Sequence, residues 1–396
     1  MSRPAEDHRA AVAAVVAGAV AARPAVTIEV AGARGRLAAD VTTGVDVPGF
    51  DNSQMDGFAV RSTDLADGPV TLTTVAHVVA GQDAPAPLPA GTAAPIMTGA
   101  AIPAGADAVV PVELTRPGGF GPVGGGAAIG FDSPVEAGTF IRRRGADARA
   151  GEVLLPAGTP VTPGAIAALT AGGIASVEVT APLRLGIVGT GTEIAAGLVP
   201  DSNAAALLAH AHELGLPARA VTVADDTDAF ATALDGLTAD CDLIVTTGGV
   251  SAGTREVVRQ VLEPTPGAWF GHVAVQPGGP QGLARWGSLP VVCLPGNPVS
   301  TLVSFELFLR PPLAEAAGVV AARPAGTAEL AEPLTSPAGK LQVRRGRFDD
   351  DGRIRLEGGP GSHLVVSYAR ADVLVMVPED VTGLDAGDTV RWWRIA

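Results

Sequence analysis

Short apolar runs alternate with helical patterns through the second half of the chain. Between residues 181 and 320, runs typical of buried strands are followed by segments whose apolar positions recur every three or four residues. The expected strands are Leu183–Val188, Ala220–Val223, Leu243–Thr246 and Val291–Leu294, and the expected helices are Ala204–Leu214, Asp228–Leu237, Arg255–Leu262 and Val299–Leu309. This alternation predicts a parallel sheet covered by helices. A ligand of such a sheet is expected beyond the carboxyl ends of its strands.

The rest of the chain is richer in short β-like runs. Residues 1–47 are typical of a helix followed by an extended segment, and residues 163–172 return to a helical pattern. Pro311 and Pro312 are expected to end the last helix of the alternating region at Arg310. We therefore predict a multidomain α/β plus β protein. Its domains are a linking domain (1–47 and 141–180), a small β-rich inserted domain (48–140), an α/β domain (181–322) and a C-terminal β domain (323–396).

Composition limits the class of protein. The chain has 396 residues, beyond the ~250–300 at which single cores stop growing, so several domains are expected. An apolar content of 47% excludes wholesale disorder, and no apolar run has membrane-spanning length. Ala10–Ala22 resembles the apolar part of a signal peptide, but Glu6 and Asp7 precede it. We interpret it as an Ala-rich helix of a cytoplasmic protein.

Net charge and cysteine usage limit the classes of partner and of site that we expect. The net charge of −14 argues against nucleic acid or an anionic membrane as a partner. An anionic ligand would therefore need a local site. Cys241 and Cys293 both lie at predicted strands and form no CxxC pattern, so we expect two buried thiols.

Two glycine-containing turns follow predicted strands. Thr247–Gly253 comes after one apolar run, and Leu294–Ser300 comes after another. The residues expected to begin the helices that follow are Ser251 or Thr254 in the first turn, and Asn297 with Pro298 in the second. One such turn alone more often only marks the start of a helix and binds no ligand. Two at the same sheet edge indicate a phosphate or anion site built from backbone N–H groups and helix N-termini.

Other polar clusters are compatible with structural or chemical roles. Gly189–Glu193 adds a carboxylate at the same sheet edge, although Gly-x-Gly without a third glycine is a weak dinucleotide signal. Phe50–Ala59, Arg142–Asp147 and Gly361–His363 could equally be turns or solvated strand ends. Scattered carboxylates and hydroxyls without a Cys/His cluster would suit Mg²⁺-assisted chemistry on a phosphate ester. The residues alone leave the substrate open.

These motifs, in this order, resemble the MoeA/gephyrin-E family, the molybdopterin molybdenumtransferases. The matching segments are Pro48–Gly57, Ile96–Gly99, Gly105–Val110, Ile141–Asp147, Gly189–Glu193, Asp201–Asn203, Gly248–Gly253, Leu294–Ser300 and Gly361–His363. The resemblance implies an elongated homodimer of four-domain subunits, with a cleft between the α/β domain of one subunit and parts of the other. It also implies insertion of molybdate into adenylylated molybdopterin with release of AMP, a divalent cation such as Mg²⁺, and a molybdopterin adenylyltransferase as a further partner.

The resemblance also implies roles for individual residues. The catalytic residues implied are Asp56, Thr98, Asp147, Glu193 and Glu256, with Glu193 and Glu256 as metal ligands. Glu256 stands where the family usually has aspartate. The substrate-binding residues implied are Thr247, Gly248, Gly249, Val250, Ser251, Gln276, Pro295, Gly296, Asn297, Pro298, Ser300 and Ser362.

One departure from the family pattern removes charge. The usual Lys-Pro-Gly-Lys-Pro is Gln276–Pro280 here, with the sequence Gln-Pro-Gly-Gly-Pro. Lys340 is the only lysine, so coding bias should have turned a lost lysine into arginine. Losing two preorganised donors costs about 3–4 kcal/mol each, and we expect Arg255 or Arg285 to compensate. Two alternatives to the transferase stay open. One is a non-catalytic paralogue that binds a pterin or nucleotide as a carrier or scaffold, and the other is a nucleotide-pyrophosphate hydrolase.

Overall fold

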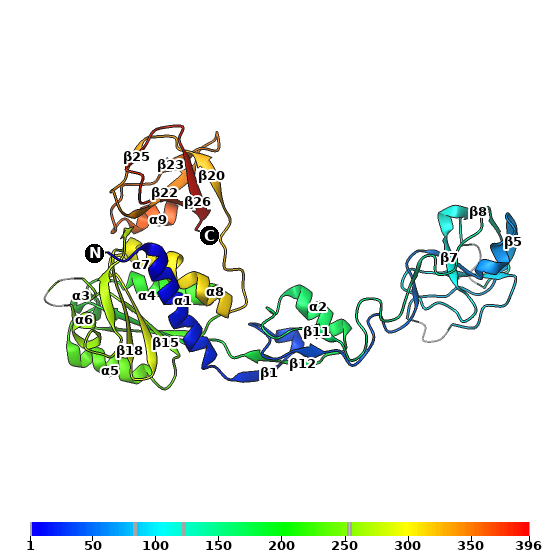
Figure 1. The fold of residues 1–396 in the computed structure, drawn as a ribbon, viewed down its shortest axis with the longest axis horizontal. Helices are drawn as coiled ribbons and strands as arrows, with labels where there is room; N and C mark the ends of the chain where they lie inside the picture. The colour runs from blue at the N-terminus through cyan, green and yellow to red at the C-terminus, as the bar shows by residue number, and fades with distance from the viewer. Residues whose placement is uncertain (1, 82–84, 121–123, 252, 254–255, 396) are drawn as a thin grey trace.

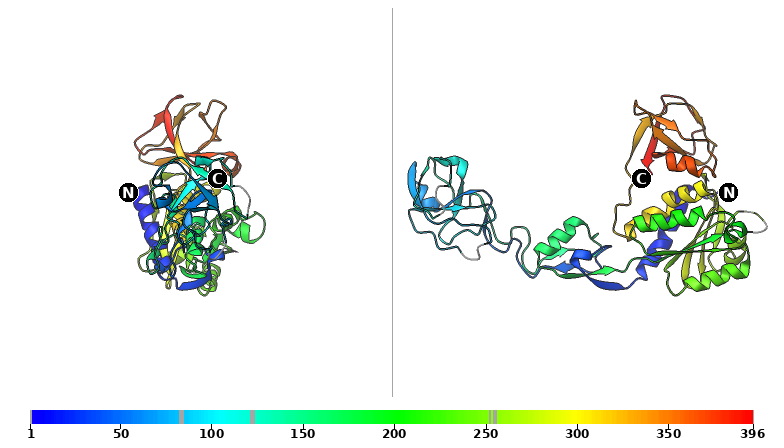
Figure 2. Two further views of the ribbon diagram at one scale, coloured as in Figure 1. Left: turned by 90° about the vertical axis from the view of Figure 1, so that its right-hand side faces the viewer. Right: turned by 180° about the vertical axis from the view of Figure 1, so that it is seen from behind.

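The computed structural model describes residues 2–81, 85–120, 124–251, 253 and 256–395. The molecule is elongated: an α/β body with the C-terminal domain beside it lies at one end, and a narrow linking region leads to a separate β domain at the other (Figure 1). The view from behind shows the same separation (Figure 2). Within the described ranges, no helix is both long and apolar enough to cross a membrane.

A six-stranded sheet with the order β14-β13-β15-β19-β18-β16 forms the α/β body. Its strands are β13 (Leu185–Thr190), β14 (Ala218–Val223), β15 (Leu243–Thr247), β16 (Trp269–His272), β18 (Pro280–Trp286) and β19 (Leu289–Leu294). The first four strands in this order are parallel, which confirms the predicted alternation. β18 and β16 extend the sheet in antiparallel fashion. They were not predicted, because Gly271, Pro280 and Gly282 interrupt their apolar pattern.

Helices cover both faces of this sheet. They are α3 (Thr192–Ala195), α4 (Ser202–Glu213), α5 (Thr227–Leu237), α6 (Val257–Leu262), α7 (Pro298–Ser304) and α8 (Arg310–Ala316). Strand side chains alternate between faces, so Leu243 packs in the core that contains α4 and α7, and Ile244 in the core that contains α5 and α6. The N-terminal helix α1 (Ala5–Ala21) joins the first of these cores through Val12 and Val16. From the sequence, we had predicted that this helix belongs to the linking domain. The predicted buried thiols are both found.

The last helix of the α/β body does not end at Arg310, so that prediction is wrong. The segment η4 (Phe305–Leu309) forms a π-helical turn after α7, and α8 then continues with Pro311 in its first turn. A proline is tolerated in a first turn because its missing N–H has no partner there. The π turn shifts the hydrogen-bond register just before the prolines.

The distal β domain and the linking region are built from short strands. The distal sheet has the order β7-β4-β6-β5-β9-β8. Its strands are β4 (Gly57–Val60), β5 (Val70–Thr74), β6 (Thr92–Ile96), β7 (Ala108–Pro111), β8 (Thr115–Arg116) and β9 (Ala128–Phe131). The strand pairs β1–β12, β2–β11 and β3–β10 lead to it from the body. The linking elements are β1 (Ala25–Glu29), β2 (Val41–Thr42), β3 (Asn52–Ser53), β10 (Ile141–Arg142), β11 (Val153–Leu155), α2 (Pro163–Ala171) and β12 (Ser176–Thr180), and the short 3₁₀ turns are η1 (Val30–Gly32), η2 (Ser62–Leu65) and η3 (Val112–Leu114).

The C-terminal domain shares a sheet with the α/β body. The order is β17-β22-β24-β26-β20, with β23 beside β22 and a separate pair β21–β25. The elements are β17 (Val275–Gln276), β20 (Ala325–Glu329), β21 (Leu334–Thr335), β22 (Leu341–Phe348), β23 (Ile354–Leu356), α9 (Val365–Arg370), β24 (Val373–Val377), β25 (Gly383–Leu384) and β26 (Thr389–Arg394). In sequence, β17 lies between β16 and β18 of the α/β body, but its Gln276 pairs in register with Gln342 of the C-terminal domain. The Gln276–Pro280 segment therefore lies at a domain junction, with Gln276 in a strand.

Candidate functional site

Three strand-end turns meet at one edge of the α/β sheet. β13, β15 and β19 are adjacent parallel strands, so their carboxyl ends lie side by side. A Cβ built on Gly296 would lie 3.0 Å from the Cα of Gly248, and a Cβ on Gly248 would lie 2.8 Å from Oγ1 of Thr190. The Thr190 hydroxyl also donates to the carbonyl of Thr247 at 3.3 Å. Because no side chain fits between these turns, the backbone itself lines the edge.

Side chains from two helices fix the turn between β19 and α7. Asn203 of α4 donates from Nδ2 to the Gly296 carbonyl at 2.7 Å. Thr301 of α7 donates to the Pro295 carbonyl at 2.6 Å. Asn297 occupies the N-cap position of α7, as predicted, but its side chain makes no capping hydrogen bond within the described part of the chain. The exposed Asn297 carboxamide is therefore free to face a ligand.

Glu256 folds back onto the turn between β15 and α6. Helix α6 begins at Val257 with Glu256 as its N-cap, so the cap is not Ser251, and Thr254 lies outside the described residues. Glu256 Oε2 accepts the N–H of Ser251 at 3.2 Å. Oε1 would lie 2.8 Å from a Cβ on Gly253. The carboxylate thus holds the turn and stays at the sheet edge.

Glu193 provides the second carboxylate at this edge. It is exposed and lies in α3, directly after β13. Its turn is anchored by Asp225, whose Oδ2 accepts the N–H and the hydroxyl of Thr192 at 3.1 and 3.3 Å. Among the described residues, no group of three or more His, Cys, Asp or Glu side chains could hold a metal ion. A divalent cation at Glu193 and Glu256 would therefore need ligands from a substrate as well.

The C-terminal domain reaches the same edge through two polar residues. The N–H of Val299, near the start of α7, donates to the carbonyl of Ser362 at 2.9 Å. Gln276 Oε1 accepts a hydrogen bond from Gln342 Nε2 at 2.7 Å. Ser300, also a predicted binding residue, lies in α7 and is 4% exposed. The structure therefore places Ser362 beside the start of α7, next to the second glycine turn, and Gln276 against Gln342 of the C-terminal domain.

Two arginines that the sequence analysis missed hold the Ser362 loop. Arg344 and Arg345 lie on β22 and are 7% and 1% exposed. Their guanidinium groups donate to three carbonyl groups of residues 358–361. Burial lowers the pKa of both. No local signal marked them, because β22 also contains Gln342 and Arg347, and charged side chains in a strand are usually exposed.

Asp56 and Thr98 form a contact in the distal β domain. Asp56 Oδ1 accepts the N–H of Thr98 at 2.6 Å and its hydroxyl at 2.8 Å. These two hydrogen bonds hold the pKa of Asp56 below its ordinary value. Asp147 is exposed, and its N–H donates to the Val47 carbonyl at 2.9 Å where the linking region meets this domain.

Within one chain, the predicted site residues fall into two groups. Asp56, Thr98 and Asp147 belong to the distal side of the molecule, and the remaining residues lie at the edge of the α/β sheet. The linking strands separate the two groups (Figures 1 and 2). A single chain does not bring them together.

Of the two arginines expected to compensate for the lost lysines, the structure describes one. Arg255 lies outside the described residues. Arg285 donates to the Ser288 carbonyl at the end of β18 remote from Pro280. At ~3.3 Å per residue, roughly 16 Å of strand separates Arg285 from Pro280, so its predicted role is wrong.

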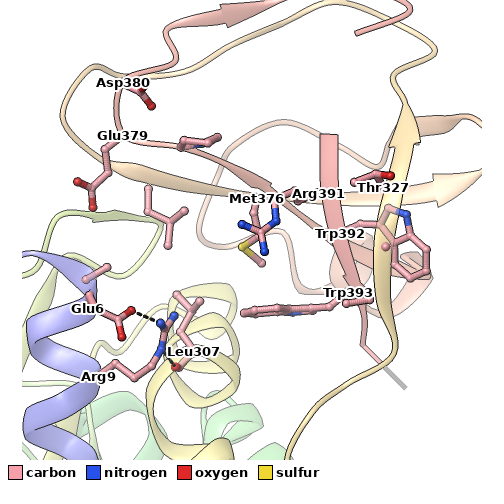
Figure 3. Close-up of a pocket in the computed structure, with 15 residues that line it drawn as sticks. Glu6, Arg9, Leu307, Thr327, Met376, Glu379, Asp380, Arg391, Trp392 and Trp393 are labelled. Atoms are coloured by element: carbon pink, nitrogen blue, oxygen red, sulfur yellow. Dashed lines mark hydrogen bonds and ion pairs between the residues drawn. The ribbon is translucent and has the colours of Figure 1, made fainter. Parts of the chain in front are cut away.

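A cavity of about 900 Å³ lies between α1 and the C-terminal domain (Figure 3). Its walls include Glu6 and Arg9 of α1, Leu307 of the π turn and Trp393 of β26. Arg9 pairs with Glu6 and donates from Nε to the Leu307 carbonyl at 3.2 Å. None of the predicted site residues lines this cavity, so its size does not identify the site.

Comparison with known proteins covers nearly the whole chain. Residues 3–173 match the family model described as the MoeA N-terminal region (domain I and II). Residues 186–315 match a probable molybdopterin binding domain, and residues 327–395 match the MoeA C-terminal region (domain IV).

Curated relatives and solved structures agree with these matches. Molybdopterin molybdenumtransferase 2 of Mycobacterium tuberculosis (strain H37Rv) is 39% identical over 414 aligned positions, covering 99% of this chain and 100% of that protein. Molybdopterin molybdenumtransferase of Synechococcus elongatus is 35% identical, covering 90% of each chain. The crystal structure of the molybdopterin biosynthesis MoeA protein from Pyrococcus horikoshii matches with a TM-score of 0.76 and 27% identity over 100% of both chains.

Proposed function

This chain belongs to the MoeA family of molybdopterin molybdenumtransferases, and we propose that it inserts molybdate into adenylylated molybdopterin with release of AMP. The reaction is a step of molybdenum cofactor biosynthesis, which we place in the cytoplasm. The observation that carries the proposal is the contact between the Gly248 and Gly296 turns. Adjacent backbone turns at a parallel-sheet edge are suited to hold phosphate groups.

In this proposal, each group of residues has a distinct task. The turns Thr247–Ser251 and Pro295–Ser300 hold the phosphates of the substrate through backbone groups and helix N-termini. Ser362 and Gln276 orient its oxygen atoms with neutral polar groups. Arg344 and Arg345 keep the Ser362 loop in place and add positive charge behind it.

A divalent cation, Mg²⁺, is part of the proposal. Glu193 and Glu256 would hold it together with substrate phosphates, a donor set that suits Mg²⁺ because this ion takes few protein carboxylates. When bound, it would neutralise charge on the departing phosphate. Among the described residues, no group of three or more His, Cys, Asp or Glu side chains forms a complete protein cage for the ion. Cation binding should therefore be weak without substrate.

We further propose that the working unit is a homodimer. Asp56 and Thr98 adjoin β4 and β6 of the distal β domain, which lies apart from the α/β body within one chain (Figure 1), so a second copy would supply them together with Asp147. Closed two-fold dimers are the most common way for two identical chains to share such sites. Each dimer would then hold two composite sites.

One experiment separates this function from its alternatives. Purified protein receives adenylylated molybdopterin, supplied by a molybdopterin adenylyltransferase (the further partner we propose), with Mg²⁺ and molybdate. We expect AMP release that requires molybdate, together with active cofactor. Tight binding without AMP release would indicate the non-catalytic paralogue. AMP release without any need for molybdate would indicate the hydrolase.

A further inference from the structure

The arm, defined as the linking region together with the distal β domain, leaves the α/β body through two chain segments. One segment joins α1 to β1, and the other joins β12 to β13. They meet side by side, because the Ala181 N–H donates to the Pro24 carbonyl at 3.0 Å. Asp242, whose side chain is 13% exposed, binds Arg23 and Arg184 of these segments at 2.9 and 3.0 Å. Two adjacent segments held by one residue form a hinge, so further contacts must fix the direction of the arm.

Arg36 supplies a second contact, to a different element of the body. Its Nε donates to the Glu315 carbonyl in the last turn of α8 at 2.7 Å, and its Nη1 donates to the Gly158 carbonyl of the linking region at 2.8 Å. The Glu315 carbonyl also accepts the N–H of Gly318, two residues after α8, at 3.1 Å. Cations are favoured at the carboxyl end of a helix, where carbonyl groups lack helical partners. One planar guanidinium thereby joins the arm to α8 in a fixed geometry.

The backbones of Gly318 and Gly35 lie in close contact beside this hydrogen bond. Gly318 has a φ of +70°, and a Cβ built on it would lie 2.2 Å from the Gly35 carbonyl oxygen. The Gly35 carbonyl is itself held within the linking region, because it accepts the Val161 N–H at 2.9 Å. A cavity of about 580 Å³ lies at the same junction, with Ile28 of the arm and Leu216 of the body among its walls. Since the junction is not closely packed throughout, its geometry depends on a few defined contacts.

We propose that Arg36 and Gly318 are positioning residues, which brace the arm against α8 and set its direction. The arm carries Asp56, Thr98 and Asp147, the distal half of the proposed site. In the proposed dimer, the direction of the arm determines where this half meets the glycine turns of the second copy. The link to turnover rests on the proposed function, whereas the brace rests on contacts within one chain. Groups from separate domains must be aligned closely, because a misplacement of about 1 Å can reduce a rate about 100-fold.

The test uses the full-length protein with two variants of the brace, each with a matched control. Arg36→Ala removes both hydrogen bonds of the guanidinium, and its control Arg34→Ala removes an exposed arginine two residues away. Gly318→Ala adds a Cβ where the Gly35 carbonyl lies. Its control is Gly339→Ala, because Gly339 has a similar φ of +72° and no described atom lies within 4 Å of a Cβ built there.

The direction of the arm is measured as the distance between two spin labels on one chain. Leu114→Cys places one label in the distal β domain, where Leu114 is 64% exposed, and Ala239→Cys places the other at an exposed position after α5. The native Cys241 and Cys293 are buried, so the labels attach to the introduced cysteines. Labelled chains are mixed with an excess of unlabelled chains, so that the distance within one chain is observed. Unlabelled variants give kcat and KM for the adenylylated substrate.

We expect the distance distribution to broaden in Arg36→Ala, which frees the arm, and its mean to shift in Gly318→Ala, which pushes the two backbones apart. In both variants kcat should fall by up to about 100-fold. KM should stay near wild type, because the glycine turns of the α/β body are untouched. Arg34→Ala and Gly339→Ala should keep both the distance and kcat of the wild type.

Three results would overturn the proposal. The first is an unchanged distance distribution in both variants of the brace, and the second is an equal change in their controls. The third is a changed distribution with wild-type kcat, which removes the positioning role. If the wild-type protein does not turn over at all, the proposed function fails, and the distance comparison still decides whether Arg36 and Gly318 set the direction of the arm.

Discussion

Gly248 is subject to two independent constraints that exclude a side chain. Its φ is +90°, and a Cβ would lie 2.8 Å from Thr190 Oγ1. Gly248→Ala should therefore lower the free energy of unfolding by about 1–3 kcal/mol, the usual cost of a strained backbone conformation. It should also weaken binding of the adenylylated substrate, because the neighbouring Gly296 turn must shift. Urea denaturation and calorimetric titration measure the two effects.

A second glycine provides the control for that substitution. Gly236 lies inside α5, and no described atom lies within 4 Å of a Cβ built there. Gly236→Ala should raise the free energy of unfolding by about 0.5–1 kcal/mol, since alanine loses less conformational entropy in a helix. Equal stability of the two variants would contradict the constraint on Gly248.

Restoring a lysine at position 279 should raise turnover. The nearest atoms to a Cβ on Gly279 are 3.5 Å away, whereas Gly278 has a φ of +106° and meets Ser304 at 2.8 Å. Position 279 therefore accepts a side chain and position 278 does not. A preorganised donor to a developing oxyanion contributes about 10²–10³-fold to kcat. Gly279→Lys should approach that gain in the AMP-release assay.

Gly279→Gln is the uncharged control for this substitution. It adds a polar side chain of moderate length without a cation, so its kcat should stay near wild type. If both variants gained equally, or if neither gained, positive charge would not be the limiting factor. We would then consider the buried Arg344 and Arg345 as the groups that already supply the positive charge.

The Asp56–Thr98 contact predicts a sign for the pH dependence of stability. The N–H of Thr98, followed by its hydroxyl, lowers the pKa of Asp56 below the ordinary value of 3.8. A carboxyl with a lower pKa in the folded state contributes stability above its unfolded pKa and loses it as the pH falls. The difference in thermal midpoint between wild type and Asp56→Ala should thus be full near neutral pH and shrink below about pH 4. A difference that grows in acid would contradict this sign.

At the scale of elements, local patterns and long-range contacts differ in how well the sequence reveals them. The helix α4 and the strands β13 and β15 follow from apolar periodicity and from turn residues, which are local signals. Antiparallel β18 and the continuation of the helix through Pro311 depend on neighbours, so their residues alone do not predict them.

The candidate site shows the same division. The glycine turns were predictable because glycine marks tight backbone geometry wherever it occurs. The roles of Arg344 and Arg345 were not, because the carbonyl groups that they bind belong to a loop further along the chain. Sequence also could not reveal that Gln276 pairs with Gln342, since strand pairing across a domain junction leaves no local pattern.

The π turn carries a buried ion pair that ties the α/β body to the C-terminal connection. The Glu306 side chain is 1% exposed and lies 2.8 Å from Arg323, which is 12% exposed. Glu306→Gln leaves this arginine with the more exposed Glu213 as its remaining carboxylate. We expect a loss of about 3 kcal/mol in the free energy of unfolding, at the low end for a broken buried pair.

An exposed pair in the same domain is the control for the Glu306 substitution. Arg259 of α6 and Glu263, the residue that follows this helix, lie 2.8 Å apart, with 31% and 48% of their side chains exposed. Glu263→Gln should cost about 0.5 kcal/mol or less, because solvent screens such pairs. Chemical denaturation of both variants tests the difference. Comparable losses would show that burial of Glu306 does not set the strength of its pair.

At the scale of the whole molecule, the elongated shape leaves apolar surface beside the distal half of the proposed site. Phe50, Met97 and Phe140 expose 51%, 40% and 37% of their surface. Met97 directly precedes Thr98, and the Phe140 carbonyl accepts the N–H of Gln54, two residues before Asp56. Exposed apolar side chains around a polar pair are typical of a surface that another protein covers. This supports the proposed second copy at that position.

Mixed dimers test whether two chains share each site. Asp56→Ala and Glu193→Ala change opposite halves of the proposed site, so each variant alone should be inactive. When the two variants are co-expressed, half of the dimers are mixed and each mixed dimer has one intact composite site. Activity should then return to about a quarter of the wild-type value, as random pairing in a two-fold dimer requires. Co-expression of Asp56→Ala with Thr98→Ala is the control, because both changes affect the same half and no intact site can form. Activity in the control, or none in the first mixture, would place both halves of the site within one chain.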